Sequence, residues 1–371
     1  MLKSFVAACL LTLTFIAVPA FASFDMNDAS IMMPLASNDL NALLKPNDQA
    51  AKGELLQLAH LNANGDLVSG IANAKLYNEY LRVVAIRLDP CFIEGTGPKA
   101  CRRLIRLAWQ PVFKTESGAL STLDAAVHSF YQFKDETEWN QILKTWPRVE
   151  KKDQGLPLQP HPVLTRESLK GPFWLRLKSF LLSTCGEQNL VRVTVMNLPF
   201  NNLWVFQGFE YKRGKRFPIM IPRSETVKQT FALSLDPNKF EGGLDPRLTK
   251  EWFWNMFLKD SDEIKVAGTI QEITDVVDEL ANPKLQNAGT VDCVSCHVAQ
   301  PARRWAENDW RFPTLTNFPN LYKNPRANLQ NITTSAKTNR IRAFGYFANE
   351  PYISQRVINE TAEVVDRLNS N

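Results

Sequence analysis

The sequence is poor in the groups that most hydrolases and metal sites use. It has four histidines in 371 residues, and it contains neither G-x-S-x-G nor H-E-x-x-H. Its formal net charge of +5 is too small to indicate nucleic acid as a partner. After the first 22 residues no apolar run is long enough to span a bilayer, and there is no internal repeat or low-complexity segment. We therefore expect a globular protein without a transmembrane segment.

The first 22 residues have the layout of a signal peptide. One charge, Lys3, precedes an apolar run that ends in the small-x-small triplet Ala-Phe-Ala at 20–22. This layout predicts cleavage between Ala22 and Ser23. Cys9 stands too early for a lipoprotein box, because almost no apolar segment precedes it. The expected location is periplasmic or secreted, in a Gram-negative bacterium.

Export would leave five cysteines in an oxidising compartment, where cysteines tend to pair or to hold a cofactor. Cys91 and Cys101 flank a loop with Gly and Pro between two predicted strands. A disulfide is favoured there and would stabilise the fold by about 3 kcal/mol. Cys185 ends a predicted helix and is expected to be a buried thiol. An odd number of cysteines leaves one without a partner in any pairing scheme.

Residues 23–264 show the pattern of an α+β domain. Alternation such as Leu-Val-Arg-Val-Thr-Val at 190–195 predicts half-buried antiparallel strands. Segments that begin with acidic residues or proline, one of which ends at a glycine, predict helices that pack on that sheet. The expected strands are 81–90, 103–113, 189–198, 202–211, 216–222 and 227–237, and the expected helices are 121–133, 135–146 and 171–186.

The character of the chain changes at about residue 265. Amphipathic helices are predicted at 269–283 and 353–370, with a Pro- and Asn-rich stretch at 301–330 between them. We therefore expect residues 265–371 to form a second, small and mostly helical domain that is nearly free of strands.

The most informative stretch is Cys-Val-Ser-Cys-His at 293–297. Cys293 and Cys296 are one helical turn apart, so both thiols face the same way and suit two thioether bonds to a porphyrin. His297 follows at once and can reach the iron from the same side, which is why C-x-x-C-H indicates covalent haem attachment. A Cys293–Cys296 disulfide remains an alternative. Zinc is disfavoured because the sequence has no second C-x-x-C and no H-x-x-x-H.

On these residues the C-terminal part resembles the c-type cytochromes, with a helix before the motif and a terminal helix well after it. The resemblance implies one covalent haem c, anchored by Cys293 and Cys296 and ligated by His297 on the proximal side. It also implies a redox partner protein. The stretches LDPCF at 88–92 and AFGYFANEPYISQRVINETAEVV at 343–365 resemble secreted bacterial proteins.

One departure from the cytochrome pattern concerns the sixth ligand. These domains usually supply a methionine downstream of the motif, but no methionine or histidine follows His297 here. The iron is therefore five-coordinate or takes another side chain. Arg303 and Arg304 could pair with haem propionates, although a solvated face is the simpler interpretation. The candidates for the sixth ligand are Tyr346 and Tyr352 in the tail, and Met256, Met220, Met196, His60, His128 and His161 upstream.

Three functions fit these observations. The first is an exported mono-haem cytochrome for electron transfer, whose N-terminal domain docks a partner or screens the haem. The second is a haem peroxidase or a gas or redox sensor with an open or unusual sixth ligand. The third is a haem-free secreted binding protein with a Cys293–Cys296 disulfide. The oligomeric state cannot be predicted from the sequence.

Overall fold

The computed structural model describes residues 23–35, 40–57, 79–93, 101–200, 202–236, 242–245, 270–310, 320–327 and 340–370. The predicted signal peptide lies outside this part of the chain, as do the ligand candidates His60 and Met256. Among the described residues, helices and strands occur in similar amounts, which confirms the α+β class.

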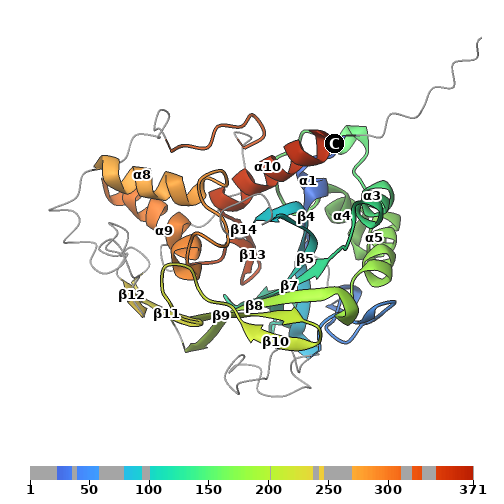
Figure 1. Ribbon diagram of the computed structural model, residues 1–371, viewed down its shortest axis with the longest axis horizontal. Helices are drawn as coiled ribbons and strands as arrows, with labels where there is room; N and C mark the ends of the chain where they lie inside the picture. The colour runs from blue at the N-terminus through green and yellow to red at the C-terminus, as the bar shows by residue number, and fades with distance from the viewer. Residues whose placement is uncertain are drawn as a thin grey trace, which may run out of the picture.

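A ten-stranded antiparallel sheet forms the centre of the molecule (Figure 1). The strand order along it is β1-β4-β5-β7-β8-β9-β11-β12, with β6 paired to β5 and β10 paired to β9. The strands are β1 Ser30–Met32, β4 Leu81–Ile93, β5 Cys101–Lys114, β6 Leu120–Thr122, β7 Ala126–Gln132, β8 Leu190–Phe200, β9 Leu203–Lys212, β10 Lys215–Pro218, β11 Lys228–Leu233 and β12 Gly242–Asp245. A separate short hairpin pairs β2 Gln49–Ala50 with β3 Gly53–Glu54.

The prediction of a helix at 121–133 is wrong. This segment forms β6 and β7, and β7 lies between β5 and β8 in the sheet. Val127 and Tyr131 on one face of β7 are buried in the main hydrophobic cluster, and Phe130 on the other face is buried as well. A strand covered on both faces loses the simple alternation of apolar and polar residues. Its apolar positions then also match a helical spacing, and strand pairing decides between the two.

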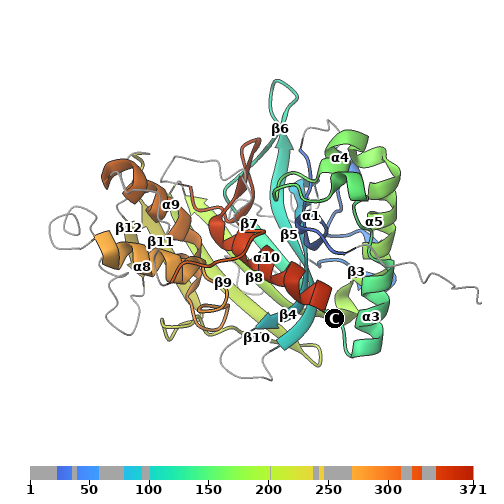
Figure 2. The ribbon, with the colours of Figure 1, turned by 90° about the horizontal axis from the view of Figure 1, so that it is seen from above.

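Helices cover both faces of the sheet (Figure 2). On one side lie α3 and α5, which confirm the helices predicted there; on the other lie α8, α9 and α10. The helices are α1 Met26–Ala29, α3 Glu136–Thr145, α4 Pro162–Glu167, α5 Pro172–Thr184, α8 Ile270–Ala281, α9 Cys293–Trp310 and α10 Gln355–Ser370, and the 3-10 turns are η1 Leu40–Ala42, η4 Lys151–Asp153, η5 Ser168–Lys170 and η6 Glu187–Asn189.

The C-terminal part has its predicted helices α8 and α10, but it also contains a β-hairpin that the sequence pattern did not predict. Its strands are β13 Phe344–Phe347 and β14 Glu350–Ile353. Buried residues of this hairpin and of α10 belong to the same hydrophobic cluster as those of β4 and β5. The two ends of the described part of the chain also meet, because Asn369 accepts a 2.7 Å hydrogen bond from the backbone N–H of Phe24. The segments before and after residue 265 are therefore in close contact.

Two smaller predictions are confirmed. Cys91 and Cys101 form a disulfide between β4 and β5. The thiol of Cys185 is free and fully buried, and burial raises its pKa to about 12. None of the helices in the described part of the chain is both long and apolar enough to cross a membrane.

Candidate functional site

The C-x-x-C-H motif opens helix α9, and its start is fixed by buried polar contacts. Asp292 directly precedes the helix, and its side chain accepts a 3.0 Å hydrogen bond from the Ser295 N–H. Gln229 of β11 accepts from the Val294 N–H at 3.1 Å and donates to Asp292 at 2.9 Å. These bonds satisfy N–H groups that a helix start leaves without partners. The sheet therefore sets where the motif lies.

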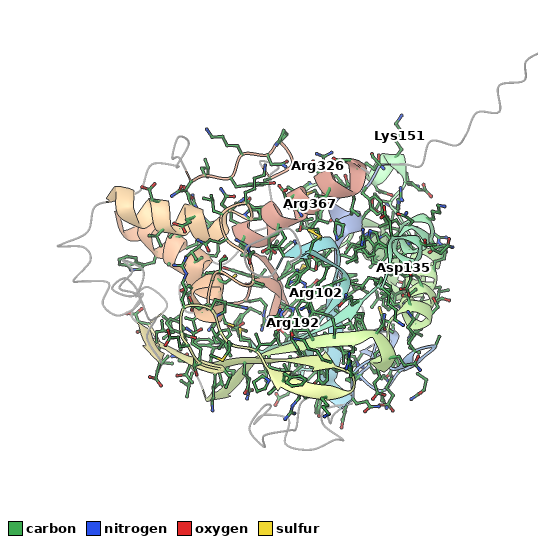
Figure 3. All side chains as sticks on the ribbon, in the orientation of Figure 1. Arg102, Asp135, Lys151, Arg192, Arg326 and Arg367 are labelled. Carbon is green, nitrogen blue, oxygen red and sulfur yellow. A yellow bond between two sulfur atoms is a disulfide. The ribbon has the colours of Figure 1, made fainter. Side chains whose placement is uncertain are left out.

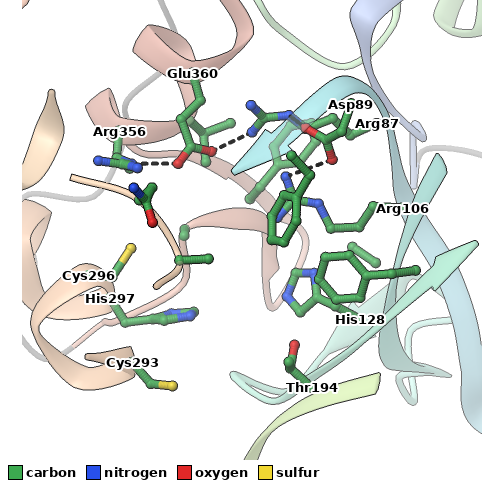
Figure 4. A pocket seen from close by; sticks show the side chains of 18 of the residues that line it. Arg87, Asp89, Arg106, His128, Thr194, Cys293, Cys296, His297, Arg356 and Glu360 are labelled. Carbon is green, nitrogen blue, oxygen red and sulfur yellow. Dashed lines mark hydrogen bonds and ion pairs between the residues drawn. The ribbon is translucent and has the colours of Figure 1, made fainter. Parts of the chain in front are cut away.

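Cys293, Cys296 and His297 all line one cavity between α9 and the sheet (Figure 4). Its volume is about 260 Å³, and the free space between its walls, including the open mouth, is about 1640 Å³. The three side chains retain some accessible surface, because they border this cavity. The cavity walls come from segments far apart in sequence: β4, β5, β7, β8, β9, α9 and α10.

The His297 ring is held by a backbone carbonyl. Its Nδ1 lies 2.9 Å from the oxygen of Ile341, and its ring centroid lies 5.2 Å from that of Phe206. Burial lowers the pKa of His297 to about 4, so the ring is neutral near pH 7. With Nδ1–H donating to Ile341, Nε2 carries the lone pair and has no hydrogen-bond partner among the described residues. Histidines that ligate metals usually have their second nitrogen paired in this way.

Ile341 is in turn tied to the sheet by Asp124. The carboxylate of Asp124 accepts a 3.2 Å hydrogen bond from the Ile341 N–H and lies 3.2 Å from the guanidinium of Arg342. Both charged side chains are almost completely buried, at 2% and 1% exposure. The backbone oxygen of Asp124 also accepts a hydrogen bond from Trp204. This network holds the carbonyl that orients His297.

The two motif cysteines are free thiols. Burial raises the pKa of Cys293 to about 12 and that of Cys296 to about 11, and the carboxylate of Asp292 adds to the effect on Cys293. A nucleophilic or metal-binding cysteine needs the thiolate, and redox-active C-x-x-C pairs lower the pKa of one thiol. The surroundings of Cys293 and Cys296 instead raise both thiol pKa values and so disfavour the thiolate.

The sheet wall opposite α9 carries His128 in a row of small side chains. On the neighbouring strands its Cα partners are Ala108 of β5 and Thr194 of β8, and next in the row come Ala85 and Gly208. The His128 ring points toward His297 across the cavity (Figure 4). Burial lowers the pKa of His128 well below 6.5, with Arg106 and His297 adding to the effect.

The adjacent row of the sheet is rich in arginine. Arg87, Arg106, Phe130 and Arg192 are successive cross-strand partners, and all line the cavity. Arg192 projects from the interior of the sheet, whereas Arg326 lies at the periphery (Figure 3). The guanidinium groups of Arg106 and Arg192 stand 5.5 and 5.7 Å from the ring centroid of Phe130.

Helix α10 completes this charged end of the cavity. Glu360 lies 2.6 Å from Arg87 and 2.5 Å from Arg356, and Asp89 lies 3.0 Å from Arg87. Burial by itself raises the pKa of Glu360, but its arginine neighbours lower it further than burial raises it. The charged end consists of Arg87, Arg106, Arg192 and Arg356 with Asp89 and Glu360, so positive charge is in excess. That excess suits the carboxylates of a bound molecule.

Most candidates for a second ligand lie away from this cavity. Tyr346 donates a 2.7 Å hydrogen bond to the Met33 carbonyl, and Tyr352 is buried in β14. Met220 is 57% exposed, and His161 caps α4 by accepting from the Leu164 N–H at 3.3 Å. Only two of the described candidates, His128 and Met196, line the cavity.

Arg303 and Arg304, which the sequence offered as partners for haem propionates, lie outside this cavity. Arg303 forms a 2.6 Å ion pair with Asp278 of α8, and neither arginine lines the cavity. Arg87, Arg106 and Arg192 lie there instead. Sequence reasoning missed them because they sit in β4, β5 and β8, far from the motif in sequence. The alternation of these arginines with valine and leucine along each strand indicated that they share one face of the sheet. It did not indicate which segment packs against that face.

Comparisons with family models, curated proteins and solved structures find no match for this chain. Among the described residues, no group of three or more His, Cys, Asp and Glu side chains gathers as a metal ion would require. The function must therefore be inferred from the cavity itself.

Proposed function

We propose that this protein is an exported mono-haem c-type cytochrome that transfers electrons, with its haem in the cavity between α9 and the sheet. The observation that carries the proposal is the position of Cys293, Cys296 and His297. All three line the same cavity from the first turns of one helix, and the paired Nδ1 of His297 leaves Nε2 available for iron.

Cys293 and Cys296 would hold the haem through two thioether bonds. Each bond would form by addition of S–H across one vinyl double bond, so no oxidant would be consumed. Cys293 and Cys296 have raised pKa values and are not bonded to each other. His297 would hold the iron on the α9 side. The haem, once bound, supplies the one-electron chemistry.

The rest of the cavity suits the other parts of such a group. The arginine-rich row gives this wall an excess of positive charge that suits carboxylates, although Arg87 and Arg106 are themselves paired with Asp89 and Glu360. Apolar side chains such as Phe206 and Val195 line other parts of the wall. The cavity lies between helices and the sheet, so most of a haem would be shielded from water. A shielded haem with fixed ligands favours electron transfer over substrate chemistry.

The proposal is tested by producing the full chain in a bacterial host that matures c-type cytochromes. A denaturing gel stained for haem peroxidase activity should show a stained band, because covalent haem survives detergent and heat. Replacing both motif cysteines (C293A/C296A) should abolish the stain. C185A is the matched control, since Cys185 is a buried free thiol outside the cavity, and it should stain like the unmodified chain.

An unstained wild-type band with a Cys293–Cys296 disulfide would overturn the proposal and favour the haem-free binding protein. A stained protein with high-spin iron that binds carbon monoxide would favour the peroxidase or sensor instead. A periplasmic location would be tested separately, by whether residues 1–22 are removed and the product appears in the periplasmic fraction.

A further inference from the structure

His128 occupies a position on the sheet wall that leaves room around its ring. Its neighbours in the row, Ala108 and Thr194, have small side chains. Side chains on one face of a sheet stand side by side, so small neighbours leave the imidazole projecting above them. Figure 4 shows the ring directed toward His297 on the opposite wall.

The His128 ring has no hydrogen-bond partner among the described residues, and its Nδ1 is buried. A buried polar group without a partner destabilises the fold, so most such groups are paired. His161, outside the cavity, has its Nδ1 paired with the Leu164 N–H and its Nε2 without a partner, whereas no hydrogen bond to a described residue reaches either nitrogen of His128. Two histidines therefore face one cavity, each with a ring nitrogen that no described residue satisfies. A ligand between them explains both.

Met196 is the competing candidate, and its surroundings favour packing. It is 2% exposed and belongs to an apolar cluster with Trp204 and Phe206. A thioether is a weak acceptor and loses little when it is buried among apolar groups. Met196 therefore needs no ligand to account for its position.

We infer that His128 is the second axial ligand of the haem iron, opposite His297. This inference depends on the proposed function, because it concerns the same haem. The iron is then six-coordinate and low-spin with two histidine ligands, although no histidine or methionine follows the motif in sequence. Two histidines give a lower reduction potential than a histidine–methionine pair. Neither axial position is open to carbon monoxide or peroxide.

The test uses the full chain with covalent haem, examined by absorption and electron paramagnetic resonance spectroscopy. Wild-type protein should be low-spin, show no methionine-to-iron band in the near infrared and ignore added carbon monoxide. H128A should lose the low-spin signal and bind carbon monoxide, and added imidazole should restore the low-spin signal. M196L is the control from the same cavity and should match the wild type in all three measurements.

A second variant keeps the test decisive if H128A fails to fold or to retain haem. H128M should gain the methionine-to-iron band, and its reduction potential should rise above that of the wild type. If the wild type carries covalent haem but H128A stays low-spin, or if M196L loses the low-spin signal, the inference is overturned while the proposed function stands. A wild-type chain without covalent haem overturns both.

Discussion

The buried ion pair between Asp124 and Arg342 gives the sharpest stability prediction. Both side chains are almost fully buried and lie 3.2 Å apart, and Asp124 also accepts from the Ile341 N–H. Removing one member of a buried pair leaves the other charge without compensation, at a cost of about 3–5 kcal/mol. The bond from Trp204 goes to the backbone oxygen of Asp124 and survives substitution. We therefore expect D124A to lower the free energy of unfolding by that amount.

The assay is urea unfolding followed by tryptophan fluorescence. With a slope of about 3 kcal/mol per M, a loss of 3–5 kcal/mol moves the midpoint down by about 1 to 1.7 M. The control is E150A at the surface. Glu150 pairs with Lys152 at 2.8 Å, but the two side chains are 75% and 65% exposed. An exposed pair contributes little to stability, so that midpoint should move by about 0.3 M or less.

The double variant D124A/R342M distinguishes the interaction between the two charges from the effect of losing each side chain. Because it removes both charges, it should be more stable than D124A alone. Equal midpoint shifts for D124A and E150A would refute the reasoning. So would a double variant whose loss equals the sum of the two single losses, since the two charges would then be independent.

Two further predictions concern the start of α9 and the N-terminal segment. Q229L removes the acceptor for the Val294 N–H and the donor to Asp292, so it should cost about 2–4 kcal/mol in urea unfolding; a loss below about 0.5 kcal/mol would contradict the contacts. Burial raises the pKa of Asp28 from 3.8 to about 7, so the folded chain binds that proton more tightly than the unfolded chain. The unfolding free energy should therefore fall as pH rises from about 4 to 7, and D28N should show a shallower fall; equal slopes in a pH series would disprove this.

The sequence alone determined the local features of this protein. Strands such as β8 could be predicted from the alternation of apolar and polar residues. The start and end of α5 could be predicted from Pro172 and Gly186. Both signals depend only on neighbours within a few positions. The same holds for the Cys91–Cys101 disulfide, which closes a short loop between adjacent strands. The spacing of Cys293, Cys296 and His297 is fixed by one turn of helix, so their common direction could be predicted too.

Only the tertiary structure decided what faces that motif. His128, Arg106 and Arg192 reach the cavity through the pairing of β5, β7 and β8, and Glu360 reaches it from α10. The segment 121–133 looked helical because a strand buried on both faces has lost its alternation, and only its neighbours in the sheet fixed its conformation. Contacts between residues far apart in sequence depend on strand order and register, which no local pattern encodes; the wall opposite His297 could therefore be seen only in the folded chain.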